Sequence, residues 1–179
     1  MHRPPDDIEP QDLARLAIEI FIRDGKVIDP PCDPQGVLAG RAGTFVTLRQ
    51  SDGQLRGCIG TVEPASSNVA AEIIQNAIGA ATRDPRFPGV LRSELSDLVY
   101  GVDVLSVPET VGGLEDLDPS IYGVIIETPD RSRRALLLPR IEGIDSAEEQ
   151  WLAVHSKAGI RPGAPVRVER FTVTRFGKE

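Results

Sequence analysis

The feature that most constrains the fold of this chain is an Asp-Gly pair, Asp52-Gly53, set between two runs of strand-forming residues. One run covers residues 44–49 and the other covers residues 55–61. Both residues of an Asp-Gly pair accept the positive φ that the tightest hairpin turns need, so the pair is a strong hairpin signal. It predicts two adjacent antiparallel strands, the second of which carries the sequence Leu-Arg-Gly-Cys-Ile-Gly.

The rest of the chain alternates helical and extended patterns. Apolar residues at helical spacing predict a first helix that Gly25 ends, and small residues predict a second helix over 69–81. Ser146 and Glu149 form a capping-box pair ahead of a third helix over 147–157. Further strands are expected at 98–105, 123–127, 135–138 and 166–176. Turns are frequent and helices are interspersed, which favours an α+β fold with a mostly antiparallel sheet and flanking helices over a doubly wound parallel sheet.

Charge and hydropathy exclude several classes of function. The 179 residues carry a formal net charge of −7, and an acidic surface repels both nucleic-acid phosphate and anionic lipid. No apolar run approaches the roughly 20 residues of a membrane span, and the polar, proline-rich start lacks the apolar stretch of a secretory signal. We therefore expect a cytoplasmic protein that binds neither nucleic acid nor membrane, in which Cys32 and Cys58 remain free thiols.

The sequence offers no metal or cofactor motif of its own. Its two cysteines and two histidines, His2 and His155, have neither zinc-finger nor HExxH spacing. It also lacks the glycine-rich patterns of dinucleotide and P-loop sites. We therefore expect no resident metal or cofactor.

The cysteine motif is the main candidate for chemistry. Side chains alternate along a strand, so Arg56 and Cys58 are expected to be neighbours on one face, where a guanidinium would favour the nucleophilic thiolate. Gly57 and Gly60 would leave room for a ligand to approach. This interpretation makes Cys58 and Arg56 catalytic and the two glycines ligand-binding. The alternative is a buried structural cysteine beside glycines that mark a β-bulge.

The chain resembles the AMMECR-domain family, and more closely its bacterial branch, AmmeMemoRadiSam system protein A. The resemblance covers residues 12–176 and is carried mainly by LRGCIG at 55–60 and ATRDPRFP at 81–88. It implies an α+β domain of a larger and a smaller subdomain, with a cleft between them lined by LRGCIG. Residues 1–11 are then expected to be a flexible lead-in.

The same resemblance implies a functional setting. Family members occur beside a radical-SAM enzyme and a Memo-type metalloprotein, so any metal or cluster would belong to these partners. Asp84 and Arg86 of the second motif would orient a small polar or carboxylated substrate beside Cys58. The expected function is an enzyme component with a thiol site and an unassigned reaction. The alternative is a non-catalytic adaptor that binds a small molecule or a partner and has a structural Cys58.

The chain departs from the family pattern at two places. Arg140 stands where relatives often carry an acidic residue or glutamine, and His155 stands in a segment where many carry a cysteine. A mechanism that uses two cysteines is therefore not expected here.

Overall fold

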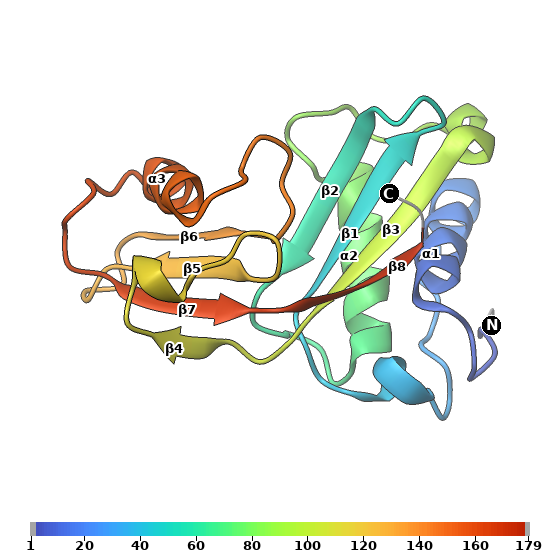
Figure 1. The fold of residues 1–179 in the computed structure, drawn as a ribbon. Helices are drawn as coiled ribbons and strands as arrows, with labels where there is room; N and C mark the ends of the chain where they lie inside the picture. Colours follow the sequence, from blue (N-terminus) through green and yellow to red (C-terminus); the bar gives the residue numbers. More distant parts are fainter. Residues whose placement is uncertain (1–2, 178–179) are drawn as a thin grey trace. The chain divides into compact units, whose positions relative to one another are not determined.

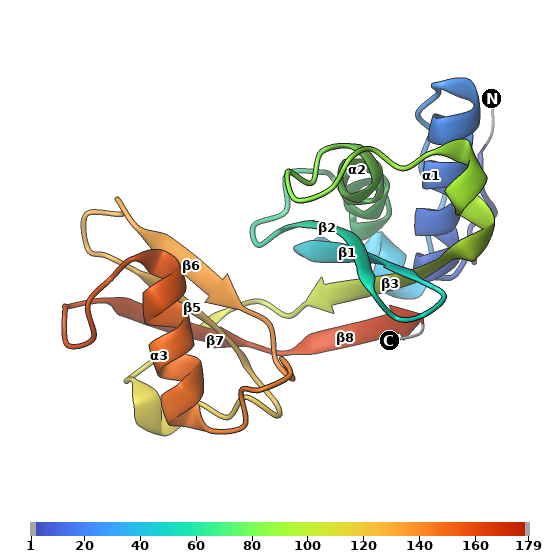
Figure 2. The same ribbon diagram turned by 90° about the horizontal axis from the view of Figure 1, so that it is seen from above.

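Two four-stranded antiparallel sheets organise the chain, with strand orders β2-β1-β3-β8 and β4-β7-β5-β6 (Figures 1 and 2). The computed structural model describes residues 3–177, which form two compact units. Unit 1 comprises the described residues up to Val104 and from Thr174 onward, and unit 2 comprises Leu105–Val173. The expected α+β class is confirmed.

Unit 1 holds the first sheet, with α1 and α2 on one side of it (Figure 2). Its elements are α1 (Pro10–Asp24), η1 (Gly36–Ala39), β1 (Thr44–Gln50), β2 (Leu55–Thr61), α2 (Val69–Thr82), η2 (Arg92–Asp97), β3 (Leu98–Leu105) and β8 (Val173–Gly177). The core is aliphatic: Leu13 and Ile18 of α1, Ile73 of α2 and Val46 of β1 are almost completely buried. Burial of such side chains is the main stabilising contribution to this unit.

The helix ends follow the predicted signals. Gly25 ends α1 in the left-handed conformation, with φ of 67°. The Asn68 side chain accepts a hydrogen bond from the Ala71 N–H and caps α2. Helix α1 begins at Pro10, inside the predicted lead-in 1–11, because proline suits the first helical turn. Residues 1 and 2 of that lead-in lie outside the described residues.

The predicted hairpin is confirmed, and its pairing contains an irregularity that the sequence did not show. Thr47 pairs with Cys58 and Leu48 with Gly57, but Arg49 then pairs with Leu55. Arg56 has no partner on β1, which is the pattern of a β-bulge. Strict alternation of side chains is therefore broken at Arg56.

A buried polar network joins α2 to the far end of the hairpin. The Glu72 carboxylate, 2% exposed, accepts hydrogen bonds from the Thr61 hydroxyl and from the Ser66 N–H. Asn76 donates from Nδ2 to the hydroxyls of Thr44 and Thr61, at 2.9 and 3.1 Å. Because the Glu72 carboxylate and the Asn76 amide group both find partners, the network can stabilise the helix–hairpin contact despite its burial.

Unit 2 consists of the second sheet and one helix. Its elements are β4 (Glu109–Val111), η3 (Leu114–Asp116), β5 (Gly123–Glu127), β6 (Arg134–Leu137), α3 (Ala147–Ala158) and β7 (Arg167–Phe171). Helix α3 packs on β5 and β6 (Figure 1). The capping box is confirmed, since the Ser146 hydroxyl accepts from the Glu149 N–H and the Glu149 carboxylate accepts from the Ser146 N–H.

The single strand predicted over 166–176 is wrong. The chain forms two strands there, β7 and β8, which belong to different sheets. Thr172 separates them, and its backbone pairs with Ser106, through Thr172 N–H to Ser106 Oγ and Ser106 N–H to Thr172 O, both at 2.9 Å. Both halves are extended, so their hydropathy pattern cannot reveal a change of sheet.

Within residues 3–177, no helix has the length and apolarity needed to cross a bilayer.

Candidate functional site

Cys58 lies on β2, at the edge of the unit 1 sheet. Its thiol is part-buried and accepts a hydrogen bond from the hydroxyl of Thr47, its cross-strand partner, with Oγ1 to Sγ 3.3 Å apart. The backbone N–H of Cys58 donates to Asp84 Oδ2 at 2.8 Å. Asp84 therefore satisfies an N–H group that an edge strand would otherwise leave unpaired.

The Asp84 carboxylate also fixes Arg86. Asp84 is 5% exposed, and it accepts hydrogen bonds from the Arg86 backbone N–H, from Nε at 3.0 Å and from Nη2 at 2.7 Å. These bonds, with help from the Cys58 N–H, hold the pKa of Asp84 well below its usual range, although burial acts in the opposite direction. The Asp84 side chain is therefore ionised at neutral pH.

Arg86 presents the free part of its guanidinium outward. Its side chain is 55% exposed, and Nη1 makes no hydrogen bond to any of residues 3–177. The Arg86 guanidinium also lies 5.5 Å from the centre of the Phe87 ring. The result is an arginine whose position is set by a buried carboxylate and which keeps an unused donor group.

Arg56 does not have the role that the sequence analysis gave it. Its side chain is 9% exposed, and the guanidinium forms a two-pronged ion pair with Glu94, from Nε at 2.7 Å and from Nη2 at 3.0 Å. It also donates to the carbonyls of Pro88 and Gly89. The β-bulge places Arg56 at the strand edge, so it ties β2 to the segment 88–94.

The pKa of the Cys58 thiol is raised. Burial is the largest cause and favours the neutral thiol; the Thr47 hydroxyl and the charge of Arg86 act in the opposite direction, and the charges of Asp103 and Asp84 add to the increase. Arg56 is not among the main groups in this balance. The Arg56 guanidinium, expected to stabilise a thiolate, is bound to Glu94 instead, and the raised pKa of Cys58 corresponds to a protonated thiol at neutral pH.

Close packing explains why Gly57 and Gly60 of the motif have no side chain. A side chain at Gly57 would collide with the backbone carbonyl of Ala80 on α2, and one at Gly60 would collide with the Phe45 ring. The room expected there for a ligand is thus filled by the protein itself.

The two positions that depart from the family pattern lie in unit 2. His155 is fully buried; its Nδ1 lies 2.8 Å from the Trp151 carbonyl oxygen and its ring packs on the Trp151 indole. Arg140 has a positive φ of 59° and donates from Nε to the Ser120 carbonyl. His155 is therefore a packed core histidine. The expected cleft between subdomains remains a prediction.

Sequence reasoning missed two residues near the thiol, Thr47 and Asp103, and also Glu94, the partner of Arg56. Thr47 could have been found from the hairpin register, because it faces Cys58 across the turn. Asp103 and Glu94 come from distant segments, and no local pattern marks them. Over residues 3–177, no group of three or more His, Cys, Asp or Glu side chains is arranged to hold a metal ion.

Comparison with known proteins identifies the family. The profile of the AMMECR1 family matches residues 11–179. The chain belongs to the AMMECR1 family. A protein of Thermotoga maritima is 52% identical over 161 residues, which cover 89% of this chain and 91% of that protein. A protein of Clostridium acetobutylicum is 42% identical over 91% of this chain, but the match covers only 34% of its own length.

The AMMECR1 fold of this chain also resembles a solved structure. The crystal structure of an uncharacterized protein from Pyrococcus horikoshii superposes with a TM-score of 0.85 at 34% identity, over 95% of this chain and 90% of that one. The arrangement of elements described above is therefore shared with an experimentally determined structure.

Proposed function

We propose that this AMMECR1 domain is a non-nucleophilic binding component of the AmmeMemoRadiSam system, which holds a small anionic substrate at the Cys58–Asp84–Arg86 site. The observation that carries the proposal is the arrangement of Arg86, which is fixed by a buried carboxylate beside a neutral thiol and keeps a free donor group.

The chemistry of arginine selects the ligand class. A guanidinium presents N–H donors in a planar fork that matches carboxylate and phosphate oxygens. Asp84 holds Arg86 before a ligand arrives, so less conformational entropy is lost on binding. Because Asp84 neutralises the charge of Arg86, the gain comes from directed hydrogen bonds more than from net charge.

The neutral thiol favours binding over nucleophilic catalysis. A nucleophilic cysteine needs a thiolate or an adjacent base. The group that contacts Cys58 Sγ is the Thr47 hydroxyl, which cannot serve as a base at neutral pH, and the neighbouring Asp84 is committed to Arg86. The thiol can still act as a weak hydrogen-bond donor or a soft contact to a ligand.

The place in the AmmeMemoRadiSam system rests on the family resemblance. In this proposal a radical-SAM enzyme or a Memo-type metalloprotein in the cytoplasm supplies the metal or cluster and acts on the substrate that this domain holds. In the Clostridium relative the matching segment is one part of a longer chain.

A titration of the isolated protein tests the binding site. Succinate and inorganic phosphate serve as probes, and heteronuclear NMR follows the backbone amides of Cys58 and Arg86. We expect saturable shifts that Arg86→Ala abolishes. Arg92→Ala, which changes another exposed arginine of unit 1, should leave the shifts intact. Shifts equal to those of sodium chloride at matched ionic strength would refute the anion site.

A further inference from the structure

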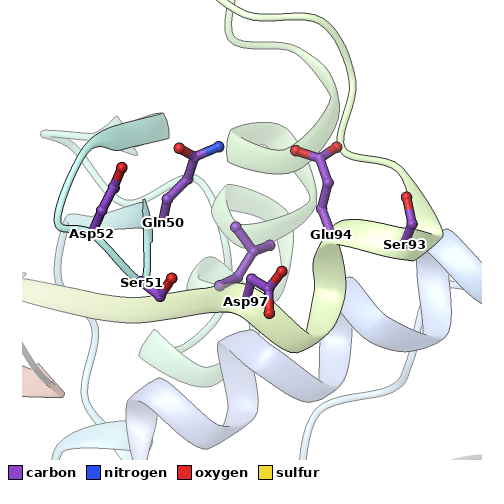
Figure 3. Close-up of a pocket in the computed structure, with 7 residues that line it drawn as sticks. Gln50, Ser51, Asp52, Ser93, Glu94 and Asp97 are labelled. Atoms are coloured by element: carbon purple, nitrogen blue, oxygen red, sulfur yellow. The ribbon is translucent and has the colours of Figure 1, made fainter.

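A concave site lies in unit 1, between the β1–β2 turn and η2 (Figure 3). The cavity has a volume of about 290 Å³, close to the lower end of the range of about 300–1,000 Å³ seen for ligand pockets. It is lined by Gln50, Ser51, Asp52, Ser93, Glu94, Asp97 and Leu98. None of the residues proposed to bind the anionic substrate lines it.

The lining is polar and acidic. Asp52, Glu94 and Asp97 contribute carboxylates, Ser51 and Ser93 contribute hydroxyls, and no lysine or arginine is among the lining residues. Figure 3 shows the Gln50 amide and the Glu94 carboxylate directed toward each other from the β1 end and from η2. Most ligand pockets are lined mainly by apolar side chains, so this one calls for a polar, positively charged ligand.

The three carboxylates differ in how far a positively charged partner offsets their negative charge. Glu94 is ion-paired with Arg56 and accepts the Leu91 N–H at 2.7 Å, so its position is fixed and its charge is largely offset. Asp52 accepts the Gln54 N–H and Asp97 accepts the Ser96 hydroxyl, but neither has an ion-pair partner within residues 3–177. The uncompensated negative charge of the cavity therefore belongs to Asp52 and Asp97.

We propose that this cavity binds the ammonium or guanidinium group of a small organic cation. Several N–H donors on one cationic group can be shared among Asp52, Asp97 and the Gln50 carbonyl oxygen, while the Arg56-anchored Glu94 forms a rigid wall. A cavity of this size takes the charged group with a short alkyl stem. A free amine and a lysine side chain share this chemistry, and the two sources are separated by the probes below.

The test uses NMR titration of the full chain with n-butylammonium and n-butylguanidinium, read at the amides of Ser51, Asp52 and Asp97. We expect saturable shifts that butyrate and sodium chloride do not reproduce at the same ionic strength. The double variant Asp52→Asn/Asp97→Asn should weaken binding about fivefold or more, the scale of one to two exposed ion pairs. Asp24→Asn, an exposed acidic position on α1, is the matched control and should bind like the wild type.

A third titration separates the two sources of the cation. The probe is Nα-acetyl-lysine N-methylamide. If it binds at least about tenfold more tightly than n-butylammonium, the site is assigned to a lysine side chain of a peptide. Equal or weaker binding would assign it to a free amine. The proposal is overturned if none of the cations shifts the pocket amides beyond the salt control, or if the double variant binds them as well as the wild type does.

Discussion

Replacement of Arg56 distinguishes most clearly between a structural and a chemical role for the cysteine motif. The structure gives Arg56 a buried guanidinium with hydrogen bonds to Glu94, Pro88 and Gly89. Arg56→Ala removes these bonds, so the Glu94 carboxylate and the Pro88 and Gly89 carbonyls lose the hydrogen bonds that Arg56 donates to them. Breaking a buried pair costs about 3–5 kcal/mol, and since Glu94 is 27% exposed and can regain water, we expect about 3 kcal/mol.

Urea denaturation measures this loss. For a denaturant slope near 2 kcal/mol/M, a loss of about 3 kcal/mol lowers the midpoint by about 1.5 M. Far-UV circular dichroism follows mainly α1 and α2 of unit 1, with a smaller contribution from α3, whereas the fluorescence of Trp151 follows unit 2 alone. A loss of the circular dichroism signal before the fluorescence change would therefore show that unit 1 is weakened. Arg56→Lys should lose about half as much, because one ammonium cannot form the two-pronged pair.

Two results would refute this reasoning. A loss below about 0.5 kcal/mol, as for an ordinary surface substitution, would show that the guanidinium is not tied to Glu94. A rise in the pKa of Cys58 in Arg56→Ala, with stability unchanged, would restore the tuning role that the sequence suggested. Arg92→Ala serves as the control for loss of an exposed arginine.

The remaining predictions concern the hairpin and the thiols. Burial opposes ionisation of Glu72, but hydrogen bonds from Thr61 and Ser66 outweigh it and lower the pKa of Glu72. The ionised carboxylate therefore stabilises the fold above about pH 4.3, the pKa of a free glutamate, and this stabilisation is lost as the pH falls through the pKa of Glu72 in the folded protein. Urea midpoints of the wild type and Glu72→Gln should therefore differ at pH 7 and converge toward pH 3; a constant difference contradicts the argument. Gly57→Ala should cost at least about 1–3 kcal/mol, because the added methyl meets the α2 backbone, and an unchanged melting temperature would exclude that contact. Freshly isolated protein should show free thiols at both cysteines in a non-reducing thiol assay, and a stoichiometric disulfide would contradict the expectation of a reducing compartment.

Local signals in the sequence were sufficient for most of the secondary structure. The Asp-Gly turn, the Ser146–Glu149 capping box and the Gly25 stop each act over a few residues, and all stand in the structure where they were predicted. Features set by distant segments could not be predicted. The sheet change at Thr172 depends on Ser106, which is 66 residues away in sequence.

The same limit applies to the candidate site. The motifs identified Cys58, Asp84 and Arg86, and the structure brings these three together. The glycines proved to be packed against the protein itself, and Arg56 was misplaced because spacing along an ideal strand suggested a neighbour of the thiol. The β-bulge and the partner Glu94, 38 residues away, redirect the guanidinium instead. A single-residue irregularity in strand pairing leaves no periodic signal in the sequence.

The titration of the Cys58 thiol tests the central claim most directly. The rate of alkylation by iodoacetamide, followed at Cys58 by mass spectrometry over a range of pH, gives the pKa of this thiol in the native protein. The account predicts a midpoint above about 8.5, the value of a free cysteine, and a further rise in Arg86→Ala, since the charge of Arg86 favours the thiolate. A midpoint below about 8.5 in the wild type would show a stabilised thiolate and would contradict the assignment of Cys58 to a non-nucleophilic binding site.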